Sequence, residues 1–130
     1  MDHQSPNEDD CPLCRFAAGE DSALNTRGDI VWQDDEMAFI SPRWWPNNPG
    51  NAIVIPRCHF ADIYALPDDL LANVARVGKR IAIAMKAAYG CDGTSLRQHN
   101  EPAGDQDVFH FHLHVFPRWI DDRLYQNTNA

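Results

Sequence analysis

Hydrophobic and polar residues alternate most regularly near the end of the chain. Histidines occupy every second position from His110 to His114, with apolar residues between and around them. Because successive side chains of a strand point to opposite faces, the pattern predicts a strand over 107–116 with three imidazoles on one face, spaced about 6–7 Å apart. We expect Pro117 to end this strand. Four apolar residues form its other face, which is predicted to be buried: Phe109, Phe111, Leu113 and Val115.

Shorter apolar runs predict the rest of a sheet. The runs are bounded by turn residues. The first two form a hairpin with Asp34 and Asp35 in its turn, the third is a buried central strand, and one further run follows the long helix. The predicted strands besides the histidine strand are 30–33, 37–41, 51–56 and 93–99. A short helix or turn is expected over 11–18, closed by Gly19. Prolines and a glycine make 42–50 a loop, and 100–105 a second one.

One segment has the three- and four-residue periodicity of an amphipathic helix. It runs from Pro67 to Tyr89, with Asp68 and Asp69 complementing the helix dipole and Gly90 suited to the C-terminal cap. Its apolar residues are expected to face the core: Leu70, Val74, Val77, Ile81, Met85 and Ala88. An antiparallel sheet of about five strands with one long helix on one face is an α+β fold.

Length and charge limit the classes of partner. The chain has 130 residues, 44% of them hydrophobic, which suits one compact domain. A formal net charge of -8 argues against a nucleic-acid backbone or an anionic membrane surface as partner. No apolar run approaches the roughly 18 residues of a membrane span, and the polar start lacks a signal-peptide core. We therefore expect a cytoplasmic protein with a disordered segment over 1–10, one domain over 11–120 and a tail over 121–130.

The cysteines raise the question of a metal. Cys11 and Cys14 form a CxxC pair, which in a reducing compartment indicates a metal or redox site before a structural disulfide. A metal site would require two further ligands from elsewhere in the chain. Cys58 and Cys91 have no evident partner and are expected to be small buried residues.

Three alternating histidines have three interpretations. Two histidines at i and i+2 can chelate zinc or iron, so a metal could sit on the strand itself. A neutral imidazole also attacks phosphorus well, which would make one histidine a nucleophile with its second nitrogen held by an acceptor. The third interpretation is three buried histidines with a structural role only, which would need a separate partner for each ring.

Four segments together resemble the histidine-triad (HIT) family. Residues 110–116 read His-Phe-His-Leu-His-Val-Phe, the family's alternation of three histidines with hydrophobic residues. Residues 49–59 resemble the strand that ends in Pro-Lys/Arg-x-His, and 104–108 resemble the Gly-Gln-x-Val segment before the triad, with Asp105 in place of a glycine. The exit Phe-Pro-Arg at 116–118 is found in many bacterial members. The resemblance implies the HIT-like fold.

The resemblance also implies a chemistry. The middle histidine, His112, would be the nucleophile on the α-phosphate of a nucleotide, forming a covalent nucleotidyl-histidine. His114 would donate a hydrogen bond to the phosphate or the bridging atom, and Gln106 would lie near the α-phosphate. Keeping a histidine at position 114 favours hydrolysis over transfer between sugar phosphates. The substrate would be a nucleoside phosphoramidate or a dinucleoside polyphosphate, and the alternative is a non-catalytic nucleotide-binding or scaffold protein.

Substrate contacts are less directly indicated by the resemblance. The family spacing places the upstream polar contact on His99, whereas the usual residue type, asparagine, is at Asn100. The position that usually holds the ribose hydroxyls falls on Arg43. Asp105 would put an acid close to the phosphate site, which is unexpected for an anionic substrate. Small members of the family are commonly homodimers, and we expect the same here.

The resemblance supplies ligands for the CxxC pair as well. Some bacterial members hold zinc with an N-terminal CxxC, the histidine after the Pro-Lys/Arg-x strand and the first triad histidine. In this chain the four positions are Cys11, Cys14, His59 and His110. Two cysteines and two histidines make a closed tetrahedral set, so the zinc would be structural. The alternative is a metal-free CxxC pair with His59 as a surface residue.

Overall fold

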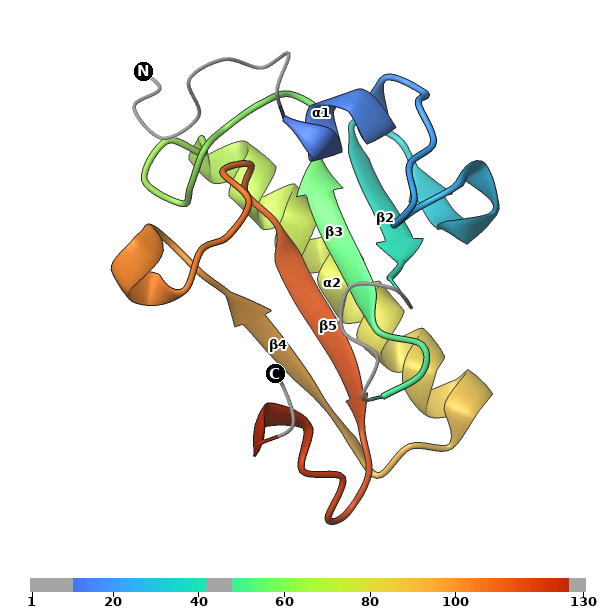
Figure 1. Ribbon diagram of the computed structural model, residues 1–130. Coiled ribbons are helices and arrows are strands. Elements are labelled where there is room, and N and C mark those ends of the chain that lie inside the picture. Colours follow the sequence, from blue (N-terminus) through green and yellow to red (C-terminus); the bar gives the residue numbers. More distant parts are fainter. Residues whose placement is uncertain (1–10, 42–47, 127–130) are drawn as a thin grey trace.

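The computed structural model describes residues 11–41 and 48–126, and it contains one five-stranded antiparallel sheet. The strand order is β1-β2-β3-β5-β4, so β5 lies between β3 and β4. The strands are β1 (Ile30–Gln33), β2 (Glu36–Ile40), β3 (Ala52–Pro56), β4 (Gly93–Gln98) and β5 (Leu113–Arg118) (Figure 1). This confirms the predicted α+β fold. Residues 1–10 and Arg43 lie outside the described residues.

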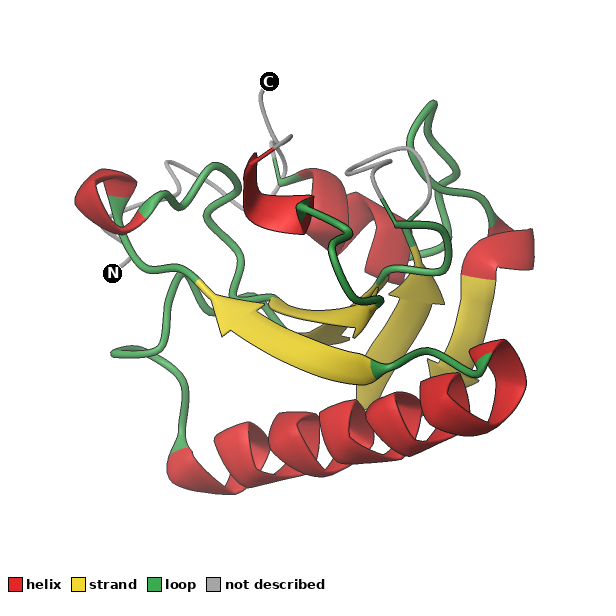
Figure 2. Ribbon diagram, turned by 90° about the horizontal axis from the view of Figure 1, so that it is seen from below, coloured by secondary structure: helices red, strands yellow, loops and turns green. Residues whose placement is uncertain are grey.

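The long helix α2 (Asp68–Tyr89) lies along one face of the sheet (Figure 2). Gly90 follows it with φ of 63°, the left-handed conformation that ends helices at low cost for glycine. The predicted apolar face is confirmed in its centre, where Val74, Val77 and Met85 are buried, while Ala88 at its end is exposed. Short helices lie elsewhere: α1 (Pro12–Ala17), η2 (Arg27–Asp29), η3 (Pro102–Gly104) and η4 (Leu124–Gln126).

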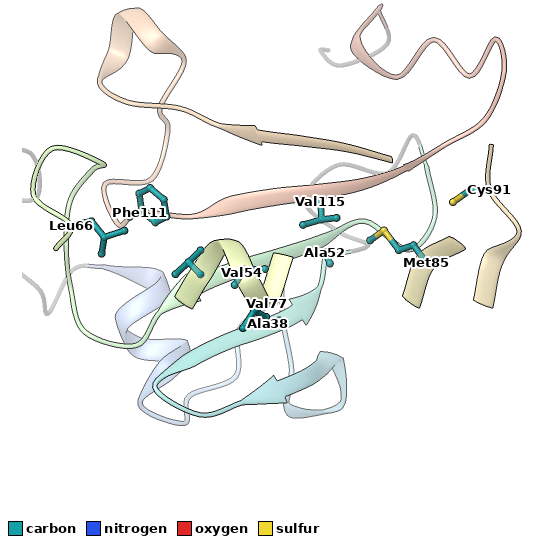
Figure 3. Packing of buried hydrophobic residues seen from close by; sticks show 10 residues of the cluster. Ala38, Ala52, Val54, Leu66, Val77, Met85, Cys91, Phe111 and Val115 are labelled. Carbon is teal, nitrogen blue, oxygen red and sulfur yellow. The ribbon is translucent and has the colours of Figure 1, made fainter. Parts of the chain in front are cut away.

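Each face of the sheet has its own core. Alternate residues of β2 and β3, such as Ala38 and Val54, pack with Val115 against α2 (Figure 3). The intervening residues, such as Phe39 and Ile53, pack instead against helix α1 on the other face. β3 is buried along its whole length because both faces are covered. The second core joins the CxxC segment to the sheet.

The prediction of a histidine strand over 107–116 is wrong in its first half. β5 begins only at Leu113, which pairs with both Val54 and Gln98. The preceding residues leave the sheet because their hydrogen bonds go elsewhere: the Phe111 N–H donates to the carbonyl of Phe60 at 2.6 Å. His110 and His112 therefore sit in an irregular segment, and His114 alone lies within the strand.

The strand also continues past Pro117, where we expected it to end. Val115 is the last residue of β5 that pairs with β3, so the missing N–H of Pro117 leaves no strand partner unsatisfied there. Its carbonyl accepts a hydrogen bond from Nδ2 of Asn48 at 2.6 Å. β5 therefore ends at Arg118.

The last described residues fold back onto the sheet. Leu124 is fully buried, and Asp122 forms two hydrogen bonds with Arg118, both at 2.8 Å. The proposed division into a domain over 11–120 and a tail over 121–130 stays a prediction. Within residues 11–41 and 48–126, no helix is both long and apolar enough to cross a membrane.

The two unassigned cysteines behave differently from each other. Cys91 is 2% exposed, as we expected of a small buried residue. Cys58, however, is exposed, and that expectation was wrong. It follows Arg57 just after the end of β3, where the chain has left the covered part of the sheet.

Candidate active site and metal centre

His112 is held by one hydrogen bond through one ring nitrogen. Its Nδ1 lies 2.7 Å from the carbonyl oxygen of His110. A carbonyl oxygen only accepts, so Nδ1 carries the proton and Nε2 carries a lone pair. The side chain is 3% exposed, and burial lowers the pKa of His112, partly offset by the hydrogen bond to the His110 carbonyl. The ring is therefore a neutral imidazole whose Nε2 carries the lone pair.

His110 is held in the opposite tautomer. Its Nε2 lies 2.8 Å from the carbonyl oxygen of Pro56, so Nε2 donates and Nδ1 has the lone pair. That lone pair points to the CxxC segment, with Nδ1 3.4 Å from Sγ of Cys11 and 3.3 Å from Sγ of Cys14. Burial lowers the pKa of His110 to about 4, which also keeps this ring neutral.

The fourth member of this cluster comes from the end of β3. Nδ1 of His59 lies 3.2 Å from Sγ of Cys14, and one donor atom from each of the four residues lies within 4.8 Å of the others. Zinc bound to sulfur and nitrogen implies ligand separations of roughly 3.3–3.8 Å. Cys11, Cys14, His59 and His110 thus form a cluster that suits a metal site. Within the described residues, neither His112 nor His114 joins that group.

His114 occupies the other side of His112. The two ring centroids are 5.0 Å apart, and His114 stacks on Phe116 at 5.4 Å with an interplanar angle of 9°. The residue is 8% exposed, and burial lowers the pKa of His114 to about 3. Two of the predicted catalytic residues, His112 and His114, are therefore adjacent, neutral and largely shielded from solvent.

Of the two candidates for the upstream polar contact, His99 has a ring contact with the triad. Its ring centroid is 6.1 Å from that of His114, and among the described residues its buried Nε2 has no hydrogen-bond partner. The Asn100 amide is engaged in the loop instead: its Oδ1 accepts from the Ile63 N–H, and it exchanges hydrogen bonds with Gln98.

Gln106 is a buried residue that holds its own loop together. Its Nε2 donates to the carbonyls of Ala61 at 2.6 Å and Val108 at 3.1 Å, and its Oε1 accepts from the Glu101 N–H at 2.6 Å. Both amide hydrogens are therefore engaged by backbone carbonyls. The contact between Gln106 and an α-phosphate stays a prediction.

Comparisons with known proteins place this constellation in a family. A family model described as "HIT domain" matches residues 25–119. The chain belongs to the HIT family. An uncharacterized HIT-like protein of Saccharolobus solfataricus is 30% identical over 113 residues, 86% of this chain and 76% of that protein. An adenosine 5'-monophosphoramidase of Saccharomyces cerevisiae is 34% identical over 108 residues, 83% of this chain and 62% of that protein.

A solved structure gives the same assignment. The crystal structure of a zinc-bound histidine triad family protein from Mycobacterium smegmatis matches this HIT protein with a TM-score of 0.78 and 31% identity, covering 91% of this chain and 81% of that one. Some relatives in the family are nucleotide hydrolases by name. The four-residue cluster and this zinc-bound neighbour agree on a metal site in the fold.

Two charged residues beside the triad of this HIT protein were missed from the sequence. Oδ1 of Asp107 lies 3.9 Å from Nε2 of His112, and Arg97 pairs with His114 in the β4–β5 register. The register of a predicted strand pair could have indicated Arg97. Nothing local indicated Asp107, because an unbroken strand over 107–116 would have placed it on the face opposite the histidines.

Proposed function

We propose that this HIT protein is a hydrolase or nucleotidyl transferase that acts at the α-phosphate of a nucleotide through a covalent nucleotidyl-histidine on His112. One observation carries the proposal: the bond from His112 Nδ1 to the His110 carbonyl leaves Nε2 with a lone pair. An imidazole nucleophile needs its second nitrogen oriented in this way. The lowered pKa of His112 keeps that lone pair unprotonated at neutral pH.

The reaction would take two displacements at phosphorus. Nε2 of His112 forms a bond to the α-phosphorus while the bond to the leaving group breaks, and the leaving group keeps the electron pair. Water then attacks the phosphorus, releases a nucleoside monophosphate and restores the neutral ring. The substrate would be a nucleoside phosphoramidate or a dinucleoside polyphosphate, and the name of the yeast relative supports the phosphoramidate.

Other residues would bind and orient the substrate. His114, next to His112, would donate a hydrogen bond to the phosphate or the bridging atom. His99 would contact the substrate from the side of His114, which its unpartnered Nε2 supports. Gln106 would position the loop that passes the α-phosphate, as its three backbone contacts indicate.

Cys11, Cys14, His59 and His110 would hold a structural zinc ion. Cysteine sulfur and histidine nitrogen both suit zinc. The Pro56 carbonyl already orients His110 so that its lone pair is on Nδ1, the nitrogen that faces the cysteines. When bound, the metal would supply a cross-link between the CxxC segment and the sheet rather than an open coordination position. Through the carbonyl of His110, the same residue would fix the tautomer of His112.

Covalent trapping tests the proposal. Wild-type protein would be mixed with an adenosine phosphoramidate, quenched within a turnover and examined by intact-mass and peptide mass spectrometry. We expect a nucleotidyl adduct on His112 and none in His112→Ala, with equal zinc content in both proteins. A protein that binds nucleotide without any adduct or turnover would contradict the proposal and favour the non-catalytic alternative.

We also propose a homodimer. β4 is an edge strand of the sheet, and Leu96 on it is 46% exposed, so the edge can pair with a second copy. Light scattering coupled to size-exclusion chromatography would show twice the chain mass. A monomer at micromolar concentration would contradict this part of the proposal.

A further inference from the structure

An acidic side chain stands beside the atom proposed as nucleophile. Oδ1 of Asp107 is 3.9 Å from Nε2 of His112. Because the His112 proton is on Nδ1, both of these atoms are acceptors, and no hydrogen lies between them. The surroundings of the Asp107 carboxylate therefore favour a group with N–H donors over one with acceptor oxygens.

Asp107 can approach a bound substrate because it is 76% exposed, whereas His112 is fixed in the interior. Its position follows from the loop that Gln106 holds through backbone contacts with Ala61 and Val108. A second acid, Asp105, lies in the same loop and is also exposed. The loop therefore brings negative charge close to His112, although the proposed substrate is itself an anion.

Among the described residues, a positive charge lies at the other end of the triad. Arg97 pairs with His114, and its guanidinium carbon lies 4.6 Å from the centroid of the Tyr125 ring. His99 and His114 have lowered pKa values, mainly through burial, so they are neutral in this environment. In the part of the chain that the structure describes, the charged group next to Nε2 of His112 is therefore the negative Asp107.

We infer that Asp107 is a specificity residue that selects an amine leaving group over an anionic one. The inference rests on the proposed function and deepens it, because it favours the phosphoramidate substrate over the polyphosphate. A phosphoramidate presents N–H groups that donate to the Asp107 carboxylate. A sulfate or polyphosphate leaving group presents only negatively charged acceptor oxygens, which the carboxylate repels.

The chemistry balances with water as co-reactant. Nε2 bonds to phosphorus as the P–N bond breaks, and the nitrogen keeps the electron pair and takes up a proton. Water then transfers its oxygen to phosphorus. The leaving amine takes two protons in all from solvent and departs as an ammonium ion, and the water that attacks afterwards returns two protons to solvent. Asp107 accepts a hydrogen bond from this nitrogen as its positive charge develops.

A pair of substrates and a pair of variants test the inference. Adenosine phosphoramidate has an amine leaving group, and adenosine phosphosulfate has an anionic one. Asp107→Asn keeps the size of the side chain and removes its charge. Asp105→Asn is the matched control, since it removes the same charge two residues away, at a φ of 71° that asparagine also adopts. Zinc content and thermal midpoint would be measured for each protein.

We expect Asp107→Asn to lower the ratio of kcat/KM for the phosphoramidate over the phosphosulfate by about tenfold or more, equivalent to about 1.4 kcal/mol. Asp105→Asn should change this ratio by less than about threefold. The inference would be overturned if Asp107→Asn left this ratio unchanged, as an equal loss on both substrates would do. It would also be overturned if the two variants changed the ratio equally. Neither outcome would affect the proposed function. A wild-type protein inert on both substrates would overturn the proposed function with it.

Discussion

His110 and His112 lie two residues apart in the same irregular segment, and both are buried and donate to a backbone carbonyl. They do so through opposite nitrogens. His110 donates from Nε2 to Pro56 and leaves Nδ1 facing two cysteines, whereas His112 donates from Nδ1 to His110 and keeps its lone pair on Nε2. The tautomer of each ring is thus chosen by the carbonyl within reach, and two identical side chains acquire separate roles.

The contrast extends to their surroundings. His110 is surrounded by potential metal ligands, with the ring of His59 5.2 Å away between centroids. His112 is bordered by His114 on one side and by the exposed Asp107 on another. The four donors of the first environment suit a structural ion, whereas the second includes the exposed carboxylate of Asp107.

The largest expected effect separates the two histidines directly. His112→Ala should lower turnover of an adenosine phosphoramidate by about 10³-fold or more, because no other group forms the covalent intermediate. Its zinc content should equal that of the wild type. His110→Ala, the matched variant, should lose bound zinc. The contrast fails if zinc, measured by atomic absorption, is lost equally from both proteins.

The second-largest effect is expected from removal of the metal. Cys14→Ala, or treatment with a strong chelator, should eliminate zinc binding and destabilise the fold by several kcal/mol, about 3–5, because the cross-link between α1 and the sheet is lost. The exposed Cys58 offers a control within the same chain. Cys58→Ala should retain one zinc per chain and an unchanged midpoint in urea. Wild-type stability in Cys14→Ala would argue against a structural ion.

A moderate effect is expected from the loop beside His112. Gln106→Ala would leave two backbone carbonyls and one N–H without their present partner, at a cost of about 1–3 kcal/mol. Turnover should fall while zinc content stays constant, because the loop carries Asp107 and not a metal ligand. Gln106→Glu would keep an acceptor for the Glu101 N–H but lose both amide donors. Its turnover should therefore stay below that of the wild type. Loss of zinc in Gln106→Ala would contradict this prediction, because it would show that the Gln106 loop also supports the metal ligand His110.

The smallest effect concerns a residue remote from both histidines. Hydrogen bonds from Arg118 and Asn48 hold the pKa of Asp122 well below its usual range. Such a carboxyl stabilises the fold above its ordinary pKa of 3.8, and this contribution is lost progressively as pH falls below that value. Asp122→Asn should cost about 1 kcal/mol at pH 7 and flatten the acid limb of the stability curve. Zinc content and turnover should not change.

Much of the fold was predictable because its signals are local. The periodicity of α2, the glycine after it and the β2–β3 runs each depend on residues a few positions apart. The set Cys11, Cys14, His59 and His110 was also predictable, through the resemblance of the flanking segments to the family. Strand periodicity misled at His110 and His112, since alternation of side chains does not reveal where a strand loses its neighbours.

By itself, the sequence determined the residue types and their spacing: three histidines at alternate positions, a CxxC pair and one amphipathic helix. The family resemblance already implied different roles for the three histidines, but only the tertiary structure decided which ring nitrogen of His110 and of His112 carries the proton. The carbonyl that orients His110 belongs to Pro56, 54 residues earlier, and the one that draws Phe111 off the sheet belongs to Phe60. A distant carbonyl chooses the tautomer of His110, and the carbonyl two residues earlier chooses that of His112, because a ring nitrogen donates to whichever acceptor the folded chain places beside it.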